Sequence, residues 1–74
     1  MEDFIVARYL FDLRADGRYV PKVNIQRRGR PEIVITDREG RTYRDLNLAL
    51  QMDFWLLTRW RAKHAPSLQV VIES

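Results

Sequence analysis

The chain has 74 residues and a formal net charge of +3, which suits one small domain with a single hydrophobic core. It contains no cysteine, so disulfides and thiolate metal sites are excluded and no oxidising compartment is indicated. No apolar run is long enough to span a membrane, and Glu2 and Asp3 stand where a secretion signal would carry basic residues. We therefore expect one cytoplasmic domain over residues 1–74 with no membrane segment.

Two similar turn motifs predict β-hairpins in the first half of the chain. Residues 14–19 (RADGRY) and 38–43 (REGRTY) each join two runs of β-branched or aromatic residues through a three-residue turn that ends in glycine. Side chains alternate between the faces of a sheet, so the loop length fixes which residues share a face. A three-residue loop at 15–17 pairs Leu13 with Tyr19, Phe11 with Pro21, Tyr9 with Val23, and Ala7 with Ile25. All eight side chains are apolar, whereas a two-residue turn would mix core and solvent positions.

Two further loops extend the same odd-numbered face. Loops at 28–30 and 38–40 pair Ile25 with Ile33, Val23 with Ile35, and Ile35 with Tyr43. Because all three connections agree on one core face, they predict a four-stranded antiparallel β-meander over roughly the first 43 residues.

The first predicted strand has an alternative interpretation. Residues 2–14 could form a helix, with acidic residues in its first turn and Gly17 beyond its end. Residues 4–11 are rich in β-branched and aromatic side chains, and strand register also explains the residues opposite them, so we favour the strand. Three apolar residues then lie on the even-numbered face of this strand, namely Phe4, Val6 and Leu10. They need to be covered by a partner or by the end of the chain.

A long amphipathic helix is predicted after Tyr43. The sequence has neither glycine nor proline from there to Pro66, Asp45 suits the N-cap, and basic residues near the far end suit the helix dipole. At about 100° per residue, one apolar stripe can lie across the sheet, made of Leu46, Ala49, Leu50, Leu56, Leu57 and Trp60. A short strand over 68–73 closes the chain. The predicted class is α+β: the meander, one long helix packed across it, and a short C-terminal strand.

Three residues of this helix depart from a simple amphipathic pattern. Leu48 and Trp55 lie outside the apolar stripe. One possibility is that the closing strand or the chain leading to it covers these two residues. The other is that they form a surface for self-association or for a partner, and Arg59 adds a positive charge to that surface. Asp53 lies within the stripe, where an unpaired carboxylate would be costly, so we expect it to reach an arginine or the edge of the core. The sequence places no second titratable group that would make Asp53 catalytic.

Basic residues are concentrated in one part of the chain. Residues 14–30 hold six basic residues against Asp16, a local charge of +5, and eleven of the thirteen basic residues in the chain are arginine. A high-GC genome would enrich arginine without any functional cause, but the guanidinium fork also suits phosphates, base edges and carboxylates. The predicted nucleic-acid-binding residues are Arg27, Arg28 and Arg30 at a hairpin tip, with Arg18 and Lys22 on the even sheet face. Exposure of Phe4 or Tyr19 would add a stacking platform.

Enzyme motifs are absent from the sequence. His64 is the only histidine and is most simply a C-terminal cap of the helix, and there is no phosphate-binding loop, H-E-x-x-H motif or serine elbow. We predict a small non-enzymatic binding domain without cofactor or metal, which contacts nucleic acid. The alternative is a module that binds an acidic protein surface or modulates a larger complex, as small phage and mobile-element proteins do, with homodimerisation through the apolar helix surface.

Overall fold

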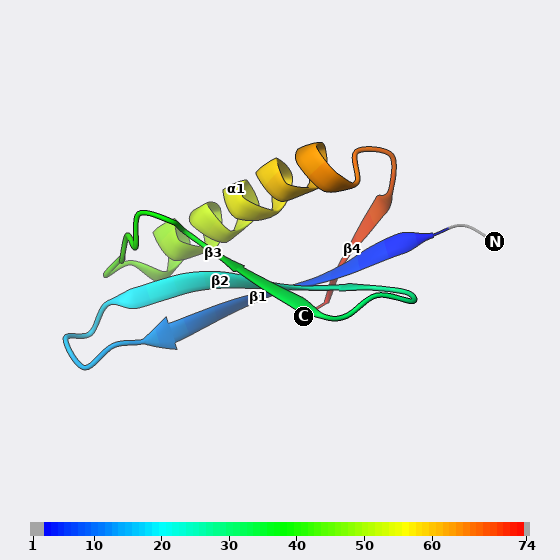
Figure 1. Cartoon of the computed structure of the whole chain (residues 1–74). Helices are drawn as coiled ribbons and strands as arrows, with labels where there is room; N and C mark the ends of the chain where they lie inside the picture. Colours follow the sequence, from blue (N-terminus) through cyan, green and yellow to red (C-terminus); the bar gives the residue numbers. More distant parts are fainter. Residues whose placement is uncertain (1–2, 74) are drawn as a thin grey trace.

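The computed structural model describes residues 3–73, and these form four strands and one helix (Figure 1). In chain order the elements are β1 (Phe4–Leu13), β2 (Tyr19–Arg27), β3 (Ile33–Thr36), α1 (Leu46–His64) and β4 (Gln69–Glu73). The strands make one sheet in the order β3-β2-β1-β4, and α1 packs over β2 and β1 on one face. The predicted α+β class is confirmed.

The hairpin between β1 and β2 has the predicted register. Leu13 pairs with Tyr19, and the antiparallel pairing continues without interruption along both strands. The backbone N–H of Arg14 donates to the carbonyl of Arg18 at 2.8 Å and closes a three-residue loop, in which Gly17 has a φ of +81° that other residues rarely adopt. The alternative helix over the first residues is therefore wrong for the described part of that segment.

The β2–β3 hairpin is also as predicted, but the third predicted hairpin is wrong. The β2–β3 pairs include Ile25 with Ile33 and Val23 with Ile35. Tyr43, expected opposite Ile35, instead forms a single antiparallel bridge with Tyr19. Because β3 has four residues and β2 has nine, β3 leaves the start of β2 without a neighbour, and the chain after the turn at 37–40 returns to pair there.

The fourth strand of the sheet is β4, which makes the sheet mixed rather than an antiparallel meander. It runs parallel to β1, with Val70 beside Ile5 and Val71 beside Val6. A parallel neighbour needs a long crossover connection, and α1 supplies it. The expectation of four antiparallel strands is thus corrected to three antiparallel strands and one parallel edge strand.

The core lies between α1 and the two central strands. Its buried apolar residues are Ile5, Ala7, Val23, Ile25, Ala49, Leu57 and Ala65. Asp45 caps the helix as predicted, because its side chain accepts a hydrogen bond from the backbone N–H of Asn47 at 2.8 Å. A single helix covers only part of the sheet, so Leu13, although on the predicted core face, is 67% exposed. Two residues of the predicted helix stripe, Leu46 and Leu50, are also exposed.

Candidate functional site

The open face of the sheet, opposite α1, carries polar side chains that are matched by acidic ones. The ammonium of Lys22 lies 2.9 Å from a carboxylate oxygen of Asp12, and Arg8 forms an ion pair with Glu73. The amides of two further β2 residues both donate to Glu32, namely Asn24 and Gln26. These contacts pair part of the charge on the face that the sequence predicted to be basic. Such exposed pairs add little stability, but they reduce the charge excess that would attract a phosphate backbone.

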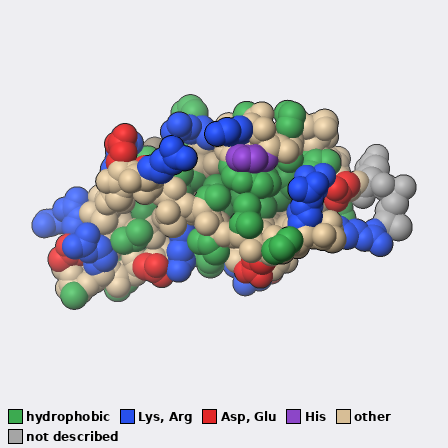
Figure 2. Space-filling model, viewed as in Figure 1, with side chains coloured by type: hydrophobic (Ala, Val, Ile, Leu, Met, Phe, Trp, Pro, Cys, Tyr) green, Lys and Arg blue, Asp and Glu red, His purple; other side chains and the backbone are tan. Residues whose placement is uncertain are grey.

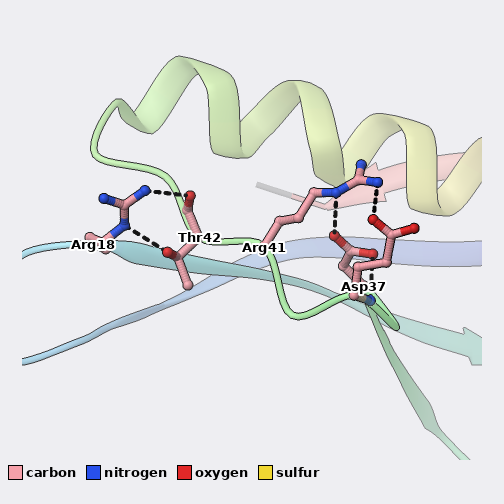
Figure 3. Close-up of polar contacts among 5 residues, drawn as sticks. Arg18, Asp37, Arg41 and Thr42 are labelled. Carbon is pink, nitrogen blue, oxygen red and sulfur yellow. Dashed lines mark hydrogen bonds and ion pairs between the residues drawn. The ribbon is translucent and has the colours of Figure 1, made fainter.

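Two of the predicted nucleic-acid-binding arginines have structural partners. The Nε of Arg18 donates to the hydroxyl of Thr42 at 2.7 Å, and its Nη2 donates to the Thr42 carbonyl at 3.2 Å (Figure 3). These bonds fasten the segment before α1 to the start of β2. At the other end of β2, the Nε of Arg27 lies 3.1 Å from a carboxylate oxygen of Asp3. The structure therefore gives Arg18 and Arg27 structural roles.

The hairpin tip between β2 and β3 brings the remaining predicted arginines to one place. Arg28 and Arg30 are exposed, and both line an open hollow of about 510 Å³, which we call the tip hollow. Phe4 lines the same hollow and is 45% exposed. The other lining residues are Val6, Gln26, Arg27 and Glu32. An exposed aromatic ring thus lies in the same hollow as two exposed guanidinium groups.

A groove between α1 and β3 contains two of the three predicted partner-binding residues. This Trp55 groove has a volume of about 640 Å³, and its apolar lining is Ile35, Met52, Trp55, Leu56 and Trp60. Trp55 is 58% exposed, and Arg59 lies in the same groove. Leu48 is 48% exposed but lies outside the groove. Within residues 3–73, the closing strand covers neither Leu48 nor Trp55.

The rim of the Trp55 groove carries a surplus of positive charge. Arg41 is neutralised, because it bonds to Glu39 and its Nε lies 3.8 Å from Asp37 (Figure 3). The hydrogen bond to Glu39, more than its charge, raises the pKa of Arg41. Arg38 and Arg59 line the same groove, and neither has a polar partner among the described residues. Figure 2 shows hydrophobic side chains gathered in the middle of one face, with basic side chains around them.

A second groove lies on the opposite flank of α1, between the helix and β4. This Phe54 groove has a volume of about 420 Å³ and a mostly apolar lining: Tyr9, Phe54, Leu57, Thr58, Arg61, Ala62, Pro66, Val70 and Ile72. Its one guanidinium is occupied, because Arg61 donates twice to the carbonyl of Leu68, at 2.9 and 2.6 Å. Phe54 is 57% exposed. Phe54 is not among the site residues predicted from the sequence. It lies about 100° around the helix from Asp53, at the margin of the apolar stripe, and this position was the available signal.

Asp53 is buried alone, contrary to expectation. It is 0% exposed, and neither carboxylate oxygen has a hydrogen-bond partner among the described residues. Burial raises its pKa to about 7, and its charge adds to the burial that raises the pKa of Tyr9. The residues one turn away on the same helix face, Ala49 and Leu57, are apolar, while Arg59 and Arg61 project to the two flanks. Asp53 lines neither groove, so we assign it no binding role.

Among the described residues, few other groups are suited to bind a metal or to take part in a reaction. Residues 3–73 contain no cluster of three or more metal-ligating side chains, and no helix in that range is both long and apolar enough to cross a membrane. The ring of His64 stacks on Trp60 at 5.2 Å, and its Nδ1 lies 3.2 Å from the Trp60 carbonyl. The Trp60 carbonyl lies four residues before His64 within α1, so this contact differs from the cap on free terminal carbonyls that the sequence predicted.

Comparison with known proteins gave no match, whether with family models, with curated protein sequences or with solved structures.

Proposed function

We propose that this protein is a non-enzymatic binding module that holds an extended acidic peptide segment of another protein in the Trp55 groove. The observation that carries the proposal is the combination of an open strand edge, an apolar groove beside it and two arginines on its rim that have no polar partner within residues 3–73. Together, these features allow one peptide to be recognised through its backbone, its apolar side chains and its charge.

The open edge belongs to β3. Among the described residues β3 pairs only with β2, so its other edge presents backbone N–H and C=O groups. An added peptide strand gains affinity from these groups, while its alternate side chains reach the helix-side surface and gain specificity there. Ile35 lies on that side and lines the Trp55 groove. A peptide on β3 therefore directs every second side chain toward the groove.

The groove favours a large apolar residue in the peptide. Trp55 has more than half of its surface exposed, and Met52 beside it has a flexible side chain that can adapt to an inserted ring. Tryptophan is among the residues that contribute most at protein interfaces when a partner covers them. We expect the apolar residue of the peptide to cover Trp55.

The arginines determine the charge of the peptide. Arg38 and Arg59 can form bidentate pairs with carboxylates, which are stronger than neutral hydrogen bonds and select against basic sequences. An acidic residue two positions from the apolar one points to the same face of the peptide strand and so satisfies both features of the groove.

A random peptide library displayed on phage and selected on the immobilised protein tests the proposal. We expect enriched sequences in which a large apolar residue and an Asp or Glu residue are two positions apart. Trp55→Ala should weaken the binding of a synthetic copy of the best peptide at least about tenfold, as measured by calorimetry. Phe54→Ala is the matched control, because Phe54 is an equally exposed aromatic on the other flank of α1. Enrichment of basic peptides, or equal losses for both variants, would contradict the proposal.

Nucleic-acid binding is the second candidate, and the tip hollow favours it. Phe4 offers a ring on which a base can stack, while Arg28 and Arg30 offer phosphate contacts in the same hollow. Because Lys22 and Arg8 on the sheet face are paired with carboxylates, we restrict this candidate to a short single-stranded segment at the tip. Such a segment would contact few phosphates, so the expected affinity is modest.

Fluorescence anisotropy with labelled single-stranded and duplex oligonucleotides across a salt series distinguishes this candidate. We expect preference for single strands and a log-log salt slope of about 0.7 per phosphate contact. Arg28→Ala with Arg30→Ala should abolish binding, whereas Arg38→Ala with Arg59→Ala removes the same charge elsewhere and should leave it. Binding that responds equally to both double variants reflects net charge alone.

A further inference from the structure

We propose that two copies of this chain pair through their β4 edges, antiparallel and about a two-fold axis at Val71, and so form one continuous eight-stranded sheet. The described edge of β4 has no neighbour, since the sheet order ends there. This inference concerns the edge opposite the Trp55 groove and does not depend on the proposed peptide.

The β4 edge lacks the features that keep edge strands from pairing. Proteins protect such edges with lysine, proline, bulges or inward-pointing charges. β4 has the sequence QVVIE and pairs with β1 at every residue without a bulge. Val71 and Ile72 at its centre are each 48% exposed. An exposed apolar strand of this kind is suited to receive another strand.

The sequence of β4 is complementary to itself in one antiparallel register. A two-fold axis at Val71 places Val71 opposite Val71 of the second copy, Val70 opposite Ile72, and Gln69 opposite Glu73. The apolar pair faces the helix side, where Val70 and Ile72 line the Phe54 groove. On the open face, one oxygen of Glu73 accepts from Arg8, and the other can accept from the Gln69 amide across the axis. Every opposed pair is therefore apolar with apolar or donor with acceptor.

The same axis brings the two Phe54 grooves together. A two-fold axis perpendicular to the sheet keeps both helices on one side of it, each with its β4 flank toward the other copy. Phe54 is 57% exposed and lines that flank together with Ile72. Pairing thus covers two apolar grooves as well as two strand edges.

Charge explains why β4 rather than β3 forms the contact. β3 is also apolar, and an axis at Val34 would match its residues in the same way. A two-fold contact at that edge would, however, bring together two copies of the Trp55 groove, whose lining includes Arg38 and Arg59. Neither guanidinium has a polar partner among the described residues, so their repulsion opposes the pairing. β4 meets no such repulsion.

Sedimentation equilibrium measures the expected association. The wild type should have twice the chain mass of 8.9 kDa, and Val71→Lys should halve the measured mass, because it places two ammonium groups opposite each other at the axis. Val34→Lys is the matched control: it puts the same charge at an exposed valine of the other edge strand and should leave the dimer intact. Circular dichroism verifies that both variants keep the wild-type helix.

Disulfide trapping tests the register itself, and the absence of native cysteine makes it specific. Residues opposite each other in an antiparallel pair have Cα atoms about 4.5–5.5 Å apart, within the range of a disulfide. Val71→Cys should therefore cross-link to a dimer with oxidised glutathione. Gln69→Cys lies on the same strand and face but about 13 Å along the strand from its counterpart, and should not.

A wild type that remains at 8.9 kDa at the highest concentration tested overturns the proposal. A dimer that survives Val71→Lys but dissociates with Val34→Lys or Trp55→Ala overturns it as well, and moves the contact to the β3 side. Equal cross-linking of Val71→Cys and Gln69→Cys overturns the register.

Discussion

The two edges of the sheet, β3 and β4, flank the same helix but differ in charge. Among the described residues, Arg38 and Arg59 of the Trp55 groove beside β3 have no polar partner, whereas Arg61 of the Phe54 groove beside β4 is fixed to the Leu68 carbonyl. Both edges are apolar and both have an exposed aromatic above them. In the two proposals, charge rather than apolar area therefore distinguishes the partners: an acidic segment for β3 and a second copy for β4.

The difference arises from the way α1 crosses the sheet. The helix packs over β2 and β1, so its two flanks overhang the edge strands. Successive residues are about 100° apart, so Phe54 and Trp55 fall on opposite flanks although they are neighbours in the chain. One helix therefore supplies an aromatic to each groove.

The largest expected effect comes from the residue between the two flanks, Asp53. Its pKa of about 7 in the folded chain is above the ordinary value of 3.8, so the folded state holds one more proton than the unfolded state between these pH values. Stability is therefore greatest at the acidic end of this window and falls as pH rises, by about 1.4 kcal/mol per pH unit.

Asp53→Asn removes this titration while keeping the shape of the side chain. We expect urea unfolding to show that the free energy of unfolding of the variant increases relative to that of the wild type from pH 4 to pH 7. Above pH 7 the difference between the two should be constant. Peptide binding in the Trp55 groove and the oligomeric mass should be unchanged. This result would show that the stability of the core is independent of binding at the two sheet edges. A gap that does not change with pH would show that Asp53 is ionised in the folded protein.

A smaller effect is expected on the β3 side alone. Arg18→Ala removes both bonds to Thr42 that hold the segment carrying the rim of the Trp55 groove. We expect a loss of about 1–2 kcal/mol in unfolding free energy. Hydrogen exchange should accelerate at the Tyr43 amide, which donates to Tyr19 at 2.9 Å, and remain unchanged in β4. Arg14→Ala is the control, since among the described residues the side chain of Arg14 makes only an exposed ion pair with Asp16. Acceleration in both edge strands would mean that the edges are coupled.

The smallest expected effect concerns the two aromatics. Trp55→Ala and Phe54→Ala each remove a side chain that is more than half exposed, so monomer stability should change by only about 0.5 kcal/mol. Thermal unfolding at a concentration where the chain is monomeric gives this value. At higher concentration Phe54→Ala should lower the midpoint further while Trp55→Ala should not, because only Phe54 lies at the β4 edge. Equal concentration dependence of the two variants would remove the contrast between the grooves.

The site was only partly visible in the sequence. Angular position on the helix identified Trp55 and Leu48 as lying outside the core stripe, and the structure brings Trp55 and Arg59 into one groove while leaving Leu48 outside it. Register along the predicted strands already placed Asp12 near the basic sheet face, and in the structure Asp12 pairs with Lys22. The bond between Arg18 and Thr42 could not be predicted in this way, because Thr42 belongs to the segment before α1, whose path is set by tertiary packing.

Local chemistry in the sequence by itself determined the first two hairpins, the helix and its Asp45 cap. Turn glycines fix loop length, and strand alternation then fixes register, so these features need no information from distant residues. Only the tertiary structure decided that Tyr43 pairs with Tyr19, that β4 lies parallel to β1, and that Asp53 is buried without a partner. Each of these depends on which strand edge remains open and where α1 lies over the sheet, and both are set by packing between segments far apart in the chain.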